Sequence, residues 1–159
     1  MDQLLQLLEG NALLTPEKLG RMLGISPEEV RRRIDAYEKS GVIRGYRAVI
    51  NDDRLNLQRV KAVIEVRITP EREGGFDRAA ERIAKFDEVS SCFLMSGAYD
   101  ILIFVEGRTL QEVAAFVASR LASLDRVQST ATHFILKTYK EQGIGMADAP
   151  REERMAVTP

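Results

Sequence analysis

The chain has 159 residues, of which 45% are hydrophobic and 30% charged, and its formal net charge of −1 does not by itself indicate a nucleic-acid binder. That length holds one ordinary domain or two small ones, and small domains gain from oligomerisation because they bury a limited share of their surface. One cysteine and one histidine exclude an intrachain disulfide and argue against a metal site, and no apolar run approaches the roughly 20 residues of a membrane span.

Residues 1–50 carry the signals of three helices. The leucines of residues 4–8 form a short apolar face that ends at Gly10. Thr15 and Pro16 then predict a helix start, since threonine caps free N–H groups and proline is tolerated at the first helical position. Leu19, Met22 and Leu23 follow at helical spacing.

The third helix is predicted to start at Ser26, with Pro27 as its first residue. We expect Glu29 to complete a capping box by reaching back to the Ser26 N–H. The helix should end at Gly41, and Gly24 supplies the positive φ that a tight corner before it needs. Two capped helices joined in this way predict a helix-turn-helix. Its core-facing side chains should be Val30, Ile34 and Tyr37.

After an extended stretch over residues 42–50, a turn begins a linker that we place at residues 51–59. Residues 60–140 then alternate between strand and helix patterns. Strands are expected over 60–68, 89–95, 99–105 and 127–139, and helices around 76–84 and 110–124. The order βαββαβ is that of a ferredoxin-like split unit.

The predicted fold class is therefore α+β. It combines an N-terminal winged helix-turn-helix over 1–50 with a ferredoxin-like domain over 60–140, followed by a flexible tail over 141–159. Two helices should cover one face of the sheet. A second copy of the sheet is the simplest cover for the other face.

Three sequence motifs, in this order, resemble those of the leucine-responsive/asparagine-synthesis (Lrp/AsnC) regulators. The corner LGISP is residues 23–27, the helix exit GVIRGY is residues 41–46, and the turn SGAYD is residues 96–100. The resemblance covers roughly residues 1–140. The chain departs from the family pattern in a shorter leading helix and in the tail after Tyr139.

The resemblance implies a transcription regulator, and the composition favours a protein of the cytoplasm without a metal or cofactor. The start of the chain also lacks the basic region of a secretion signal. Its partners would be double-stranded DNA at pseudo-palindromic sites near promoters, further copies of the chain in dimers, tetramers or octamers, and an effector such as an amino acid. No membrane partner is expected.

The candidate DNA-binding residues lie on and around the third helix, whose N-terminal part meets the bases in a helix-turn-helix. Arginine can grip guanine with two donors or neutralise a phosphate. The alternative is a solvated face in which the arginines pair with Glu28, Glu29 and Asp35. The candidates are Arg21, Ser26, Glu29, Arg31, Arg32, Arg33, Arg44 and Arg47.

The candidate effector site centres on the turn at residues 96–100, where backbone N–H groups can receive a carboxylate and Asp100 can receive an ammonium group. Hydroxyls of the last strand would join it, with Ser129 and His133 nearby. The alternative is that Gly97 only turns a hairpin and Asp100 only caps it. Cys92 is expected in the core. The candidates are Gly97, Ala98, Tyr99, Asp100, Thr130 and Thr132.

Two other functions stay open. A decarboxylase of modified haem precursors, a siroheme-decarboxylase-like enzyme, shares this architecture but would need a basic cavity with histidines, and the chain has only His133. A DNA-architectural protein without an effector would keep residues 31–33 but show no response to a ligand. The sequence shows neither a nucleophile triad nor a phosphate-binding glycine loop, so an enzyme has little support from its motifs.

Overall fold

The computed structural model describes residues 1–55, 59–70 and 75–146. Contacts divide the chain into one unit of residues Met1–Ala48 and a second unit that begins at Val49. Within the described ranges, every helix is too short or too polar to cross a membrane.

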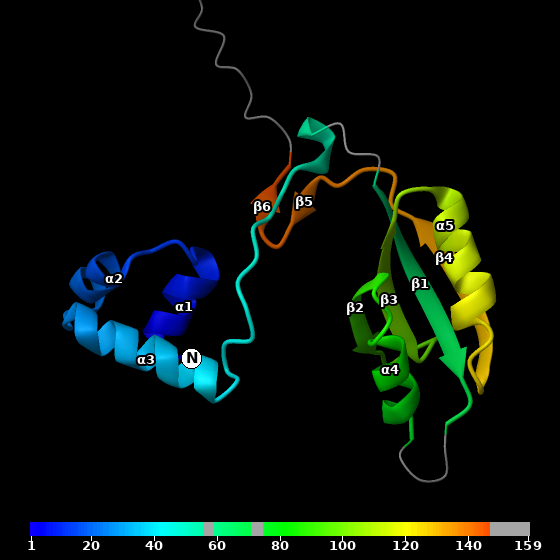
Figure 1. The fold of residues 1–159 in the computed structure, drawn as a ribbon, viewed down its shortest axis with the longest axis horizontal. Coiled ribbons are helices and arrows are strands. Elements are labelled where there is room, and N and C mark those ends of the chain that lie inside the picture. Colours follow the sequence, from blue (N-terminus) through cyan, green and yellow to red (C-terminus); the bar gives the residue numbers. More distant parts are fainter. Residues whose placement is uncertain (56–58, 71–74, 147–159) are drawn as a thin grey trace, which may run out of the picture. The chain divides into compact units, whose positions relative to one another are not determined.

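The first unit consists of three helices, drawn in blue to cyan in Figure 1. They are α1 (Gln3–Gly10), α2 (Pro16–Leu23) and α3 (Pro27–Lys39). Each start is capped by a side-chain oxygen that accepts from a backbone N–H of the first turn, as expected for two of them. The acceptors are Asp2 at 2.8 Å, Thr15 at 3.3 Å and Ser26 at 3.2 Å.

The core of this unit is small. Its fully or nearly buried members are Leu4, Leu8, Leu19 and Val30. Ile34 and Tyr37 pack against them, which confirms the predicted inner face of α3. Gly24 ends α2 with φ of 69°, so the predicted left-handed corner is present. The two helices thus form the expected helix-turn-helix.

Gly20 is a second structural glycine of this corner, and the sequence pattern did not single it out. A Cβ atom at this position would lie 2.7 Å from the carbonyl oxygen of Ile25. The Ile25 N–H also donates to the Gly20 carbonyl at 3.0 Å. The turn therefore passes so close to α2 that only glycine fits.

The segment after α3 differs from the expected wing. Residues 44–50 carry no regular secondary structure in the single chain. The Tyr46 hydroxyl donates to Glu38 at 2.9 Å, which holds this segment near the end of α3. Within one chain the expected wing therefore forms no strand pair, because an extended segment needs a partner strand to become sheet.

The second unit is built on a four-stranded antiparallel sheet with the order β2-β3-β1-β4. The strands are β1 (Val60–Ile68), β2 (Val89–Leu94), β3 (Ile101–Gly107) and β4 (Val127–Phe134). The helices are α4 (Asp77–Ile83) and α5 (Leu110–Phe116), and a π-helical stretch, η2 (Val117–Leu121), continues α5. The predicted ferredoxin-like topology is confirmed, although β4 ends five residues earlier than expected.

One face of this sheet is covered by the helices (Figure 1). Alternate residues of β1 and β3 are buried there, and α4, α5 and η2 contribute the rest of the core. Cys92, predicted in the core, is only partly buried and packs against the margin of the core, where burial raises the pKa of its thiol. The buried core is Ala62, Ile64, Val66, Ile68, Ile83, Ile101, Ile103, Val105, Val113, Phe116 and Leu121.

The opposite face of the sheet carries an apolar cluster beside charged residues such as Lys61 and Glu65, and no described helix covers it in the single chain. Register pairs Val63 with Phe104 and Phe93 with Leu102, and directly opposed residues share a face. The rings of Phe93 and Phe104 meet edge to face at 6.2 Å, and Phe93 remains 50% exposed. We call this surface the open face.

A hairpin that the sequence analysis did not predict follows β4. It consists of β5 (Lys140–Glu141) and β6 (Ile144–Gly145), with Gln142 and Gly143 at positive φ in its turn. The expected tail thus begins with an ordered hairpin. Residues 147–159 of that tail and residues 56–58 of the expected linker lie outside the described residues.

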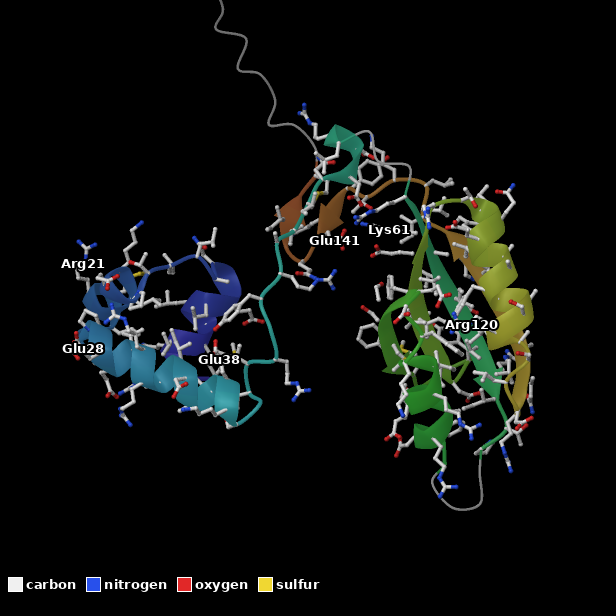
Figure 2. All side chains as sticks on the ribbon, in the orientation of Figure 1. Arg21, Glu28, Glu38, Lys61, Arg120 and Glu141 are labelled. Atoms are coloured by element: carbon white, nitrogen blue, oxygen red, sulfur yellow. The ribbon has the colours of Figure 1, made fainter. Side chains whose placement is uncertain are left out.

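The hairpin is fastened to residues that precede the sheet, around the short 3₁₀ helix η1 (Asp52–Arg54). The Asn51 side-chain amide donates to the carbonyl of Met146 at 2.9 Å. Lys61 on β1 lies 3.0 Å from an oxygen of Asp52 and 3.7 Å from one of Glu141 (Figure 2). Lys61 therefore ties together three segments that are far apart in the sequence.

Candidate nucleic-acid interface and effector site

Helix α3 has one buried and one exposed side. Val30 is fully buried, whereas the side chains of Arg31, Arg32 and Arg33 are 54%, 74% and 41% exposed. Because the caps and the core fix the helix, these three guanidinium groups are presented together on a rigid element. Such a surface can contact phosphates or base edges.

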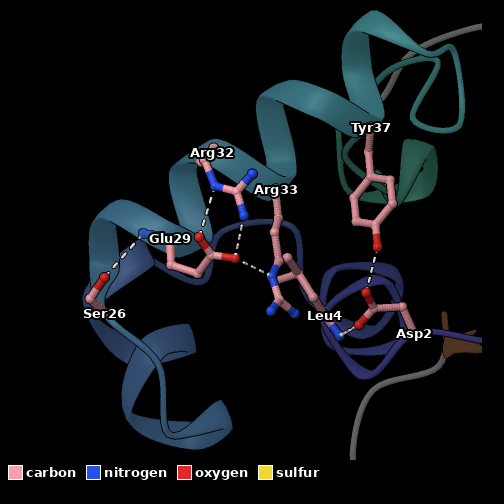
Figure 3. Close-up of polar contacts among 7 residues, drawn as sticks. All are labelled: Asp2, Leu4, Ser26, Glu29, Arg32, Arg33 and Tyr37. Atoms are coloured by element: carbon pink, nitrogen blue, oxygen red, sulfur yellow. Dashed lines mark hydrogen bonds and ion pairs between the residues drawn. The ribbon is translucent and has the colours of Figure 1, made fainter.

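Each of the three arginines is paired with a glutamate. Arg31 lies 2.5 Å from Glu17 of α2 and 3.7 Å from Glu28. Both Arg32 and Arg33 donate to the carboxylate of Glu29, as Figure 3 shows. The hydrogen bond from Arg32, followed by that from Arg33, lowers the pKa of Glu29 to about 2.

Two details of the predicted pairing are corrected. Glu29 does not reach back to the Ser26 N–H: Ser26 accepts from the Glu29 N–H, but the Glu29 carboxylate turns toward Arg32 and Arg33 (Figure 3). Charge-assisted bonds to two guanidinium groups outcompete one neutral N–H. Asp35 is also no partner of these arginines, because it accepts from Lys39 at 2.7 Å.

The remaining DNA-binding candidates lie around α3. Arg21 is exposed in the last turn of α2, and the hydroxyl of Ser26 is occupied in capping α3. Arg44 and Arg47 are exposed in the irregular segment that follows α3. All of them belong to the first unit, so one small domain carries the whole set.

Two contacts of this unit were missed by sequence reasoning. The Tyr37 hydroxyl donates to Asp2, which joins the start of α1 to α3, and Glu17 reaches Arg31 from α2 (Figure 3 shows the first of these). The hydrogen bond from Tyr37 lowers the pKa of Asp2 and raises that of Tyr37. Both contacts link different helices, so spacing along one helix could not indicate them.

The turn at residues 96–100 joins β2 to β3. Gly97 has φ of 152° and open space where a side chain would stand. An oxygen of the Asp100 carboxylate accepts from the Ile68 N–H at 2.9 Å, and the Asp100 N–H donates to Val66 at 3.1 Å. Asp100 thus anchors the turn to the end of β1. Ala98 is exposed and Tyr99 half-buried beside it.

The predicted hydroxyls of the last strand do not converge on this turn. Register places Thr130 opposite Val66 and Thr132 opposite Ile64, so both lie on the helix-covered side of β4, with β1 between them and β3. Ser129 opposes Arg67 and His133 opposes Val63, on the open face. In residues 1–55, 59–70 and 75–146, no hydrogen bond joins these side chains to residues 97–100.

Both units match known protein families. Residues 2–38 match the AsnC-type helix-turn-helix domain, and residues 61–144 match the Lrp/AsnC ligand binding domain. The chain belongs to the Lrp/AsnC family of DNA-binding transcription regulators.

Individual relatives share nearly the whole length of this Lrp/AsnC regulator. It is 41% identical over 158 residues to the uncharacterized HTH-type transcriptional regulator YugG of Bacillus subtilis, with 99% of this chain and 95% of that one covered. The solved structure of Escherichia coli AsnC is 25% identical, with a TM-score of 0.66 over 89% of this chain and 95% of that one.

A further structural relative was solved with a bound amino acid. The complex of a transcriptional regulator from Neisseria meningitidis with L-Met is 30% identical to this chain, with a TM-score of 0.66 over 89% of this chain and 93% of that one. These relatives are named as regulators of transcription rather than as enzymes.

Proposed function

We propose that this Lrp/AsnC regulator reads duplex DNA with the outer face of α3, using Arg31, Arg32 and Arg33. The observation that supports this most is a run of three arginines on α3, of which Arg31 and Arg32 are exposed and Arg33 is partly exposed, while Val30 of the same helix is buried in the core of the unit. In a helix-turn-helix this second helix enters the major groove. Arg21, Arg44 and Arg47 would then contact the backbone, and Ser26 would set the N-terminal end of the helix.

The charge balance around α3 favours modest affinity for DNA in general. Glu28 and Glu29 offset two of the three positive charges in residues 26–33. Fewer net charges release fewer counterions per protomer, so sequence-independent binding is weak. Two protomers on one site would double the contacts and steepen the dependence on salt.

The open face supports self-assembly as the second part of the function. It carries apolar side chains at Val63, Phe93, Leu102 and Phe104, and Phe93 is half exposed in the single chain. A second copy of the same sheet would cover it with two-fold symmetry and pair two recognition helices. A dimer follows from this arrangement, and tetramers or octamers would need a further contact between dimers.

The turn at residues 96–100 is the proposed effector site, and an amino acid is the proposed ligand class. The backbone N–H groups of residues 96–99 donate no hydrogen bond within the described part of the chain, so they are available to a carboxylate. The related Neisseria regulator binds L-Met. Asp100 would orient the turn through Ile68 while its charge faces an ammonium group. Thr130 and Thr132 would contact the effector only if those of a second chain lay near this turn.

An enzymatic function has less support. His133, the one histidine of the chain, is 60% exposed on the open face and lies 3.4 Å from Glu65 rather than in a cavity. That placement does not suit acid–base work on a buried substrate. The regulator would work in the cytoplasm, where duplex DNA and free amino acids are both present.

DNA binding is tested with duplexes that the protein itself selects from a random-sequence pool. Replacing Arg32 and Arg33 together with Ala should weaken binding to the selected duplex by about 100-fold, since an arginine contact contributes about 1–3 kcal/mol. Arg108→Ala, which removes an 89% exposed arginine from the other unit, is the matched control and should leave affinity unchanged. Unchanged affinity of the double variant in a gel-shift titration would show that these arginines of α3 do not contact the DNA.

The effector site is tested by thermal melting with a panel of L-amino acids. A ligand at 100 times its Kd should stabilise the native state by about 2.7 kcal/mol. Asp100→Asn keeps an oxygen acceptor for the Ile68 N–H but removes the charge, so it should abolish the shift without lowering the basal melting temperature. A shift that persists in this variant would place the ligand elsewhere.

A further inference from the structure

One carboxylate on α3 holds two of its arginines at once. The Glu29 Oε2 atom accepts from Arg32 Nε at 2.8 Å, and Glu29 Oε1 accepts from Arg32 Nη2 at 2.8 Å. The same Oε1 atom accepts from Arg33 Nε at 2.7 Å. Arg32 is therefore bound in a bidentate fork and Arg33 by one further bond (Figure 3).

This contact leaves most donors of the two arginines for another partner. A guanidinium group carries five N–H donors in a fixed plane. Glu29 takes two from Arg32 and one from Arg33, so three and four donors remain outside the contact. Glu29 is the least exposed of the three side chains, at 28%, while Arg32 is 74% exposed. The carboxylate thus lies between the two guanidinium groups (Figure 3), and solvent reaches Arg32 more than Arg33, whose side chain is 41% exposed.

The arrangement persists at physiological pH. Because the two arginines lower the pKa of Glu29 to about 2, its carboxylate is ionised throughout the neutral range. Phosphate contact needs only a mobile positive charge, whereas base recognition needs donors in a fixed plane. A side chain that fixes the plane and removes charge would favour the second kind of contact over the first.

We propose that Glu29 is a positioning residue for sequence specificity: it fixes the planes in which Arg32 and Arg33 present their outer donors and lowers the attraction of α3 for phosphate alone. The inference rests on the proposed DNA-binding role of α3. Glu29 itself need not touch the DNA.

Glu28 provides a matched control on the same turn. It is 79% exposed and lies 3.7 Å from Arg31, its ion-pair partner among the residues that the structure describes. Glu28→Gln removes one negative charge from α3, as Glu29→Gln does, but leaves Arg32 and Arg33 held. Glu29→Asp is the complementary variant, because it keeps the charge and shortens the reach of the carboxylate.

The experiment measures Kd for a duplex selected by the parent protein and for a scrambled duplex of equal length. The specificity ratio is the Kd for the scrambled duplex divided by the Kd for the selected duplex. This ratio should fall about tenfold in Glu29→Gln, in line with the loss of one well-oriented arginine–base contact per site. Glu29→Asp should lower the same ratio with unchanged Kd on scrambled DNA. Glu28→Gln should lower the Kd for both duplexes by the same factor and keep the ratio within about twofold of that of the parent protein.

Two results would overturn the proposal. One is a ratio in Glu29→Gln that equals that of the parent. The other is an equal fall in Glu28→Gln and Glu29→Gln, which would make the effect one of charge alone. If the parent protein selects no sequence from the pool, the proposed DNA-binding role itself fails, and that outcome is seen before any variant is made.

Discussion

The two units of this regulator are held together by different kinds of interaction. The helix-turn-helix unit buries four core residues among those described, and a side-chain cap starts each of its helices. The described part of the sheet unit buries eleven, drawn from strands and helices up to 59 positions apart, between Ala62 and Leu121. Local signals therefore matter more in the first unit, and long-range packing matters more in the second.

The charged side chains of the two units illustrate two kinds of pair. In the first unit Glu29 pairs with residues three and four positions away on one exposed helix. In the second unit Arg120 of η2 pairs with Glu88 at 2.6 Å and lies over the Phe86 ring at 4.5 Å. Exposed pairs within a helix contribute little to stability and are free to serve a partner. Pairs such as Arg120 and Glu88 instead connect segments that are distant in the sequence.

Core truncations should produce the largest difference in stability between the two units. Leu19→Ala and Ile64→Ala each remove a fully buried side chain and should cost about 2–5 kcal/mol. Because the first unit has the smaller core, Leu19→Ala should unfold it and abolish DNA binding, while Ile64→Ala should leave the sheet unit folded with a lower melting temperature. Calorimetry with hydrogen exchange can assign each transition. A lower melting temperature of the same unit in both variants would contradict this division.

A smaller effect is expected at the corner of the helix-turn-helix. Gly20→Ala would place a Cβ atom 2.7 Å from a backbone oxygen, so α2 or the turn must shift, at a cost of about 1–3 kcal/mol. Gly10→Ala, at the end of α1 with nothing within 4 Å, is the control and should be neutral or slightly stabilising. Urea unfolding measures both. Equal stability of the two variants would mean that the corner relaxes freely.

The smallest expected effect concerns the contact between Lys61 and the hairpin. Lys61→Met should lower the free energy of unfolding of the sheet unit by at most about 1 kcal/mol at neutral pH. The hydrogen bond to Asp52 raises the pKa of Lys61 above its ordinary 10.5. The contribution is therefore complete below that value and is lost as the pH rises through the raised pKa. Melting temperatures of parent and variant should converge at alkaline pH, and a constant difference would contradict the assignment.

Much of the architecture could be predicted from local patterns. The caps at Thr15 and Ser26, the corner at Gly24 and the alternation of β1 specify their elements through contacts within a few residues. The hairpin at residues 140–146 was missed, since its short strands lack an apolar alternation and its partners are Asn51 and Lys61. Arg31, Arg32 and Arg33 were chosen as DNA-binding candidates because they are consecutive, and their contact with DNA stays a prediction.

The sequence by itself determined the order of the elements, the helix-turn-helix corner, the ferredoxin-like topology and the arginine-bearing helix, because periodicity, capping and turn chemistry act over short distances. The tertiary structure decided which groups meet. It gave Glu29 to two arginines instead of the Ser26 N–H, gave Asp100 to Ile68, and put Thr130 on the helix-covered side of β4. The spacing of Glu29 from Arg32 and Arg33 allows their pairing, and competition with the Ser26 N–H decided it. The partners of Asp100 and the side on which Thr130 lies depend on strand register and packing, which the spacing of residues along the chain does not encode.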